Sequence, residues 1–346
     1  MKTYICTIGK CFCYLILFAP ILLLADNFSA QTPKEFGLFK SDETLEIVLK
    51  TDLRSLIKNK NDDEYQEGEI IILDKTYPVR LKARGNNRRE ICSFPPVTLN
   101  FNKTKFEDKS FEQLKKLKLV NACKMQKSYE QYILREFLIY RTFNLMTDKS
   151  FKVRLLKIDY VDTKDKVKTV TRYGFVIEDQ HMMAERLEGI IIKKTGIRDQ
   201  STTKSHIVML SVFHFMIGNT DWQVPRLHNL KLLKLNDITE ITPYVIPYDF
   251  DHTGMVNASY SIPAPILGIE SLRERLYWGK CYSEAELLSA IDLYLQKKDT
   301  IYGLYKDFEL FDKSSIKQAV SYLDSFYKII EDSKLWKYNF INKCRE

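Results

Sequence analysis

Gly218 to Gly254 reads GNTDWQVPRLHNLKLLKLNDITEITPYVIPYDFDHTG, and this stretch decides the fold. Asp221 lies in a turn, Asn229 precedes the apolar segment LKLLKL, and Asp249 follows a second apolar segment, YVIPY. Short apolar segments bounded by polar residues predict β-strands. If the two strands run side by side, Asn229 and Asp249 come close together.

These polar residues suit magnesium and phosphate chemistry. Mg²⁺ prefers carboxylate and amide oxygens as ligands. In phosphoryl transfer, the protein mainly positions the reactants and neutralises charge. Asp221 suits the orientation or deprotonation of an acceptor, while Asn229 and Asp249 suit the metal. The residues alone leave open that Asp and Asn here only shape turns.

A buried helix is expected directly before this stretch. The segment 205–217 is apolar over a wide face, which indicates a helix in the interior of a fold. Gly218 is well placed to end it, because glycine is favoured just after helices. His206 and His214 lie on this helix, where a core role is favoured over metal binding.

The N-terminal half predicts a β-rich region of antiparallel type with one helix. Apolar residues recur at intervals of three and four over 129–145, which predicts a helix that contains Glu136. The expected strands are 45–49, 68–73, 79–83, 97–101, 117–120, 151–160 and 169–177.

The last third predicts helices. Ser283 and Glu286 have the spacing of a capping box before an apolar helical pattern, and a final amphipathic helix is expected over 316–330. Strands followed by helices favour an α+β fold with two lobes and a cleft between them. The predicted divisions are a signal peptide (1–30), a β-rich N-lobe (31–180) and a mainly helical C-lobe (181–346).

The start of the chain predicts export. Lys2 and Lys10 precede an apolar run from Cys11 to Ala25, which at about 15 residues is short for a membrane span and suits a signal peptide. Cleavage is expected after Ala30, which would leave a mature chain without a transmembrane span in a secreted, periplasmic or cell-envelope location. An uncleaved membrane anchor is the alternative.

Export makes disulfides possible. Four cysteines remain in the mature chain, and the favoured pairs are Cys92 with Cys123 and Cys281 with Cys344, because each pair lies within one region. The net charge of +8 is spread along 346 residues without a basic tract, so a nucleotide or acidic surface suits the chain as a partner and nucleic acid does not.

The ordered motifs resemble the atypical kinases of the spore-coat CotH class and, more distantly, HipA-type kinases. Most of the mature chain takes part in the resemblance. The matching pieces are RLKARGNN (80–87), the helix with Glu136, YGFVIE (173–178), IGNTDW (217–222), LHNLKLL (227–233) and IPYDFD (246–251). The resemblance implies a two-lobed protein-kinase-like fold that binds ATP and Mg²⁺.

The resemblance also implies roles for single residues. Asp221 would be the catalytic base, and Asn229 and Asp249 the Mg²⁺ ligands. Asp251 would be a second metal contact or a structural acid. The cofactor side would comprise Arg84 as a phosphate-side cation, Glu136 as the ion-pairing glutamate and Glu178 at the strand that enters the hinge. The acceptor would be a protein or another hydroxyl-bearing molecule.

The chain departs from this family pattern at two points. The lysine expected on the strand after the Arg-Gly-Asn turn is missing, because Thr98 and Asn100 lie there; Lys118 or Arg84 could substitute. The interval from Asp221 to Asn229 is also longer than in HipA-type loops.

Two other functions remain open. The missing lysine allows a catalytically inactive, kinase-like binding module of the cell envelope. A metal-dependent phosphoesterase would instead use imidazole and carboxylate ligands, namely His228, Asp249, Asp251 and His252.

Overall fold

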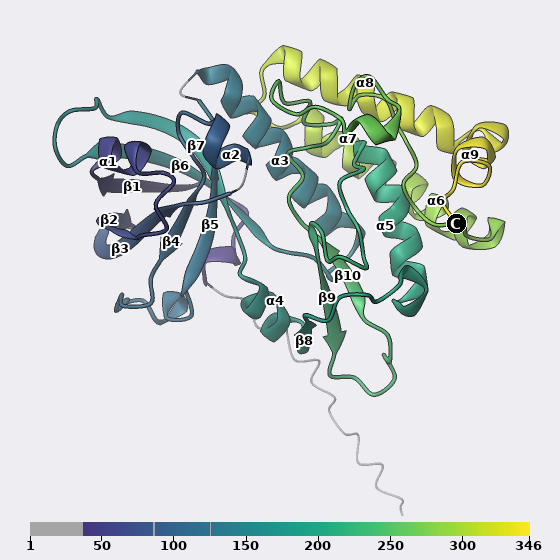
Figure 1. Cartoon of the computed structure of the whole chain (residues 1–346), viewed down its shortest axis with the longest axis horizontal. Coiled ribbons are helices and arrows are strands. Elements are labelled where there is room, and N and C mark those ends of the chain that lie inside the picture. Colours follow the sequence, from purple (N-terminus) through teal and green to yellow (C-terminus); the bar gives the residue numbers. More distant parts are fainter. Residues whose placement is uncertain (1–36, 86, 125) are drawn as a thin grey trace, which may run out of the picture. The chain divides into compact units, whose positions relative to one another are not determined.

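The computed structural model describes residues 37–85, 87–124 and 126–346 and shows a mixed α+β fold (Figure 1). The predicted signal peptide and the cleavage after Ala30 lie outside the described residues. Within those residues, no helix is both long and apolar enough to cross a membrane.

Most predicted elements are present, with bounds that differ by a few residues. The strands are β1 (Leu45–Thr51), β2 (Gln66–Ile72), β3 (Lys75–Ala83), β4 (Val97–Asn100), β5 (Lys116–Asn121), β6 (Val153–Asp162), β7 (Val170–Ile177), β8 (Gly189–Ile192), β9 (Leu230–Leu235) and β10 (Tyr244–Pro247). The helices are α1 (Leu53–Lys58), α2 (Asn87–Ile91), α3 (Lys127–Met146), α4 (Gln180–Arg186), α5 (Lys204–Ile217), α6 (Glu284–Gln296), α7 (Lys298–Lys306), α8 (Lys313–Ile330) and α9 (Ser333–Phe340).

Seven strands form a closed barrel in the order β1-β2-β3-β4-β5-β7-β6. Alternate side chains point into the barrel, as the period-two pattern of β3 predicts: Val79, Leu81 and Ala83 are buried. The expectation of a β-rich lobe of antiparallel type is wrong at one pairing, because β1 pairs with β6 in parallel and so closes the barrel. The sequence gives no local signal for this closure, since the two strands are far apart in the chain.

A second sheet holds the central polar stretch. It has the order β10-β9-β8, and β9 and β10 are antiparallel, with Leu230 opposite Pro247. The polar residues before β9 and after β10 therefore lie at the same end of this sheet, as expected.

Two helices hold the sheets in place. The buried helix α5 packs against β10 and α6, and it ends as predicted at Gly218, which has φ +66°. Helix α3 packs against β5, β6 and β7 on one side and against α7 on another (Figure 1). Glu136, in the middle turns of α3, thus lies at the end of the barrel.

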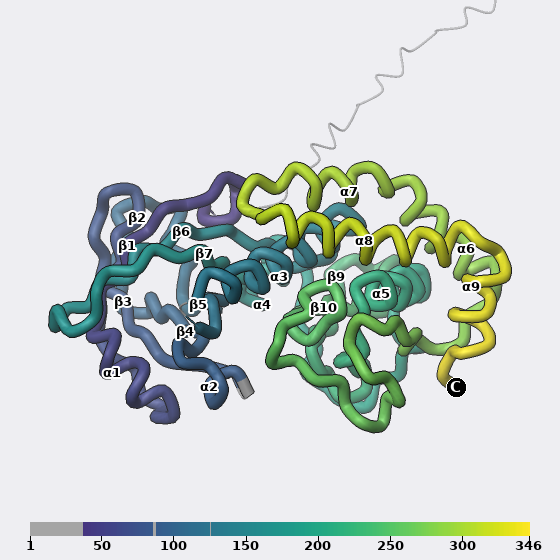
Figure 2. Tube along the Cα trace, turned by 90° about the horizontal axis from the view of Figure 1, so that it is seen from above, coloured from purple at the N-terminus to yellow at the C-terminus, as the bar shows by residue number. Residues whose placement is uncertain are grey.

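The C-terminal helices cover α5. Helices α7 and α8 lie side by side (Figure 2), and α6 begins with the predicted capping box of Ser283 and Glu286. Both predicted disulfides are present, one joining Cys92 to Cys123 and the other Cys281 to Cys344.

Candidate functional site

The turn that carries Asp221 is fixed by the end of α5. The backbone N–H of Asn219 donates to the carbonyl oxygen of His214, and the side-chain oxygen of Asn219 accepts from the backbone N–H of Asp221 over 2.8 Å. Trp222 is buried and stacks on the His214 ring at 4.5 Å between centroids. Asp221 therefore projects from a turn with a rigid base.

A short hairpin then brings the chain back to Asp221. Gln223 and His228 pair as an isolated antiparallel bridge, so Asn229 returns to the turn despite the long interval in sequence. The Asn229 side-chain amide donates to the carbonyl oxygen and to Oδ2 of Asp221, each over 2.9 Å. His228 Nε2 lies 2.8 Å from Asp221 Oδ1, a contact that the sequence did not reveal.

Asn229 and Asp249 lie together where β9 begins and β10 ends. The backbone N–H of Tyr248 donates to the carbonyl oxygen of Asn229 over 3.0 Å. Both Asn229 (φ +54°) and Asp249 (φ +65°) adopt the left-handed backbone conformation, which few non-glycine residues other than Asn and Asp occupy readily. The hydroxyl of buried Tyr140 accepts the N–H of Asp249 over 2.9 Å. Such local strain is typical of functional positions.

The barrel supplies the cations of the site. Lys118 on β5 is the direct cross-strand partner of Thr98 on β4, so a basic group lies beside the position where the resemblance predicts a lysine. Desolvation, with the positive charge of Arg84 second, lowers the pKa of Lys118 to about 8. Burial likewise lowers the pKa of Arg84, and the negative charge of Asp249 partly offsets this decrease.

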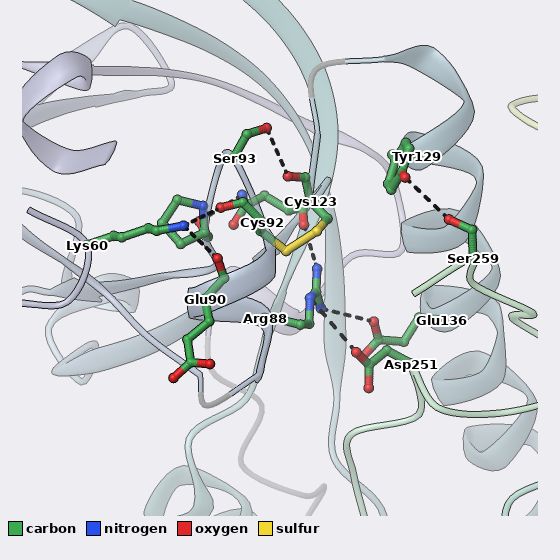
Figure 3. The surroundings of a disulfide bond; sticks show 12 residues. Lys60, Arg88, Glu90, Cys92, Ser93, Cys123, Tyr129, Glu136, Asp251 and Ser259 are labelled. Atoms are coloured by element: carbon green, nitrogen blue, oxygen red, sulfur yellow. Dashed lines mark hydrogen bonds and ion pairs between the residues drawn. A yellow bond between two sulfur atoms is a disulfide. The ribbon is translucent and has the colours of Figure 1, made fainter. Parts of the chain in front are cut away.

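A buried group of three charges lies next to these residues (Figure 3). Glu136 is 1% exposed and Asp251 is 5% exposed, and Arg88 lies between them. Arg88 Nη1 is 3.8 Å from Glu136 Oε2, and Arg88 Nε is 3.9 Å from Asp251 Oδ2. Burial raises the pKa of both carboxyls. The next largest cause is the negative charge of Asp251 for Glu136, and that of Asp249 for Asp251.

One cavity of about 230 Å³ collects these groups. Its lining includes seven of the eight residues predicted for the site: Arg84, Lys118, Glu136, Asp221, Asn229, Asp249 and Asp251. It also includes Arg88 and Tyr140, which were not predicted as site residues, and His228, which was predicted only for the phosphoesterase alternative. Arg88 lacked a sequence signal because it belongs to a five-residue helix without a periodic pattern.

Glu178 is the predicted residue that this cavity does not include. Its carboxylate forms a buried ion pair with Arg186 at 2.8 Å and accepts the N–H of Lys152. Glu178 instead borders a second cavity of about 230 Å³, which adjoins the first through Lys118 and Tyr248. A nucleotide contact by Glu178 stays a prediction. Its carboxylate is already engaged by Arg186 and by the N–H of Lys152.

The histidines do not form a metal centre with the acids. His206 and His214 are buried in the core, where desolvation lowers their pKa values to about 4 and about 3. In the described part of the chain, no group of three or more His, Cys, Asp or Glu side chains could hold a metal ion by itself.

A Mg²⁺ ion shared with phosphate oxygens and water fits the site better, because it needs only one or two protein ligands. Among the described residues, the carboxylate of Asp249 has no hydrogen-bond or ion-pair partner, and the amide of Asn229 makes its hydrogen bonds through nitrogen. The side-chain oxygens of both residues therefore remain available. Glu136 Oε2 and Arg84 Nε are buried without a hydrogen-bond partner among the described residues, which suits a charged ligand.

Comparison with solved structures finds a similarity to a proinflammatory kinase, CtkA, of Helicobacter pylori. The TM-score is 0.40 at 10% sequence identity, and the match covers 74% of this chain and 93% of that chain. A similarity of this size says nothing about the function of this chain. No protein-family model and no curated protein matches the sequence.

Proposed function

We propose that this protein is an exported, kinase-like enzyme that binds ATP with Mg²⁺ and transfers the γ-phosphoryl group to a hydroxyl of a protein or another acceptor. One observation carries the proposal: Asn229 and Asp249 meet at the end of the β9–β10 pair, beside Asp221, in a cavity that Lys118 and Arg84 also line. Acidic and basic groups share this cavity, as binding of a metal-bound phosphate requires.

Each residue has a distinct task in this proposal. Asp249 and the side-chain oxygen of Asn229 would hold Mg²⁺, which when bound neutralises phosphate charge. Lys118 and Arg84 would bind the phosphate oxygens. Asp221 would orient the acceptor hydroxyl and take its proton as the acceptor oxygen bonds to the γ-phosphorus and the bond from phosphorus to ADP breaks.

The resemblance to CotH-class kinases supports the proposal through the order of the motifs. The barrel with α3 would be the N-lobe, and the region after residue 180 would be the C-lobe. The cross-strand position of Lys118 supports the active enzyme over the inactive module, because a cation lies beside Thr98 and lines the same cavity as Asn229 and Asp249. The two disulfides suit an oxidising compartment.

The test uses labelled ATP and Mg²⁺ with the purified mature protein. Asp249→Asn should abolish Mg²⁺-dependent nucleotide binding, because it removes the ligand charge but keeps a residue that tolerates the left-handed backbone. Asp221→Asn should keep binding and lower transfer by a factor on the order of 10² to 10⁴. Asp292→Asn, on the exposed surface of α6, is the matched control.

Each result separates the candidate functions. Absence of nucleotide binding by the wild type would contradict the proposal. Binding without transfer to any acceptor or to the protein itself would support the inactive binding module instead.

A further inference from the structure

Arg88 occupies the centre of the charged group, and the roles proposed above do not use it. It lies on α2, the five-residue helix that follows the Arg84 turn (Figure 3). Its side chain is 9% exposed. A buried guanidinium group is costly unless it is paired, so the partners of Arg88 indicate its role.

Three partners from different parts of the fold surround the Arg88 guanidinium. Nη2 donates to the carbonyl oxygen of Asn121, at the end of β5, over 2.8 Å. Nη1 faces Glu136 on α3, and Nε faces Asp251 after β10. At 3.8 and 3.9 Å the two carboxylate contacts are ion pairs longer than hydrogen bonds, so Arg88 acts on these acids through its charge.

We propose that Arg88 is the positioning residue of the site, and that the Cys92–Cys123 disulfide keeps it there. Arg88 would hold the carboxylates of Glu136 and Asp251 in place beside Asp249. The inference rests on the proposed function, because it explains how the candidate metal ligand Asp249 is kept in position.

The three acids need such a cation. Glu136 and Asp251 are buried, and Asp249 lines the same cavity two residues before Asp251. Like charges that lie close together away from water repel each other, and the Arg88 guanidinium between Glu136 and Asp251 opposes this repulsion. In the described part of the chain, Glu136 forms its ion pair with Arg88 and not with Lys118, which leaves Lys118 available for phosphate.

The disulfide is the main support of α2. A helix of five residues has little stability of its own. Cys92 follows α2 directly and is bonded to Cys123, which lies between β5 and α3. The N–H of Phe94 donates to the Cys123 carbonyl oxygen over 3.1 Å, and the Lys60 ammonium group donates to the Cys92 carbonyl oxygen over 2.8 Å. The disulfide thus ties α2, which carries Arg88, to the segment between β5 and α3. Strand β5 carries Lys118, and α3 carries Glu136.

The first experiment compares the two disulfides. Cys92→Ser with Cys123→Ser should weaken Mg²⁺-dependent ATP binding, measured by calorimetry, by about tenfold or more, a loss typical of residues that orient metal ligands. Cys281→Ser with Cys344→Ser removes the other disulfide, which links the segment before α6 to the C-terminus, and should leave the affinity unchanged. Equal affinities of the two folded double variants would overturn the inference.

The second experiment does not depend on the disulfide. Arg88→Met should lower kcat for transfer and weaken Mg²⁺-dependent ATP binding, because Glu136 and Asp251 lose the cation that lies between them. Arg88→Lys, which keeps a positive charge there, should restore part of both. No rescue by Arg88→Lys would contradict a positioning role through charge.

A third measurement separates this inference from the proposed function. If the wild type binds no nucleotide, the proposed function fails. The charge contact can then be tested by urea unfolding of Arg88→Met, Glu136→Gln and the double variant. Non-additive effects on the free energy of unfolding would support the Arg88–Glu136 contact, and additive effects would overturn it.

Discussion

Lys118 on β5 lies directly opposite Thr98 on β4, so both side chains project from the same face of the barrel. Lys118 thus lies beside the position at which the resemblance to CotH-class kinases predicts a lysine. Because Lys118 borders both cavities at the end of the barrel, its charge is available to a ligand in either one.

Nucleotide affinity should therefore depend on pH through Lys118. Desolvation lowers its pKa to about 8, so the ammonium group loses its charge as the pH rises through this value. Affinity for Mg–ATP should fall between pH 7 and 9 by no more than about tenfold per pH unit. Titration calorimetry of Lys118→Arg, which stays charged, should show no such fall. Exposed Lys317→Met is the control, and an unchanged profile for Lys118→Met would refute the prediction.

His228 should support Asp221 in the transfer step. Its ring nitrogen lies 2.8 Å from Asp221 Oδ1, so His228→Phe removes a contact to a charged group. We expect kcat to fall roughly tenfold, in line with the loss of one hydrogen bond to a charged partner. The KM for ATP should stay unchanged, because the phosphate-binding residues are untouched. A change confined to KM would show that His228 acts on nucleotide binding instead.

Glu136 should make the ligand-free protein less stable as the pH rises. Burial, followed by the charge of Asp251, raises its pKa above 4.5, so there is a pH range in which the folded state binds a proton that the unfolded state releases. This contribution is complete below pH 4.5 and is lost as the pH rises through the raised pKa. Urea unfolding over this range should show that Glu136→Gln gains stability relative to wild type with increasing pH. A constant difference between the two proteins would contradict the prediction.

Gly218 should be intolerant of substitution for two separable reasons. Its φ of +66° disfavours any side chain by about 1–2 kcal/mol, and a Cβ atom there would lie 2.1 Å from the Tyr322 hydroxyl oxygen. Gly196 has a similar φ of +81°, but a Cβ atom there would meet nothing within 4 Å. In urea unfolding, Gly218→Ala should thus cost more than Gly196→Ala. Equal losses would show that Tyr322 yields to the new methyl group.

The sequence predicted the elements that depend on local pattern. The apolar face of α5 and the stop at Gly218 identified the helix beneath the site, and the two flanking strands correctly placed Asn229 near Asp249. The favoured cysteine pairs also proved correct. In each case the signal lies within a short segment of sequence or in the small number of possible cysteine pairings.

The missed features depend on distant pairings. The hairpin bridge between Gln223 and His228 cannot be recognised from the spacing of Asp221 and Asn229 alone. Helix α2 is too short to have a periodic pattern, and Arg88 gains its partners only when β5, α3 and the segment after β10 come together. Glu178 has an acidic side chain at an expected ligand position, but its buried partner Arg186 becomes evident only in the folded chain.

The parallel pairing of β1 with β6 also sets an order on folding. Leu45 must meet Leu156, and this contact must wait until the chain between them has been made and has formed its own hairpins. Loop closure over such a distance is slow, because its entropy is lost before any contact compensates for it. A growing chain that ends before Val153 would expose both uncovered edges of the sheet, so folding is open to aggregation until β6 has closed the barrel.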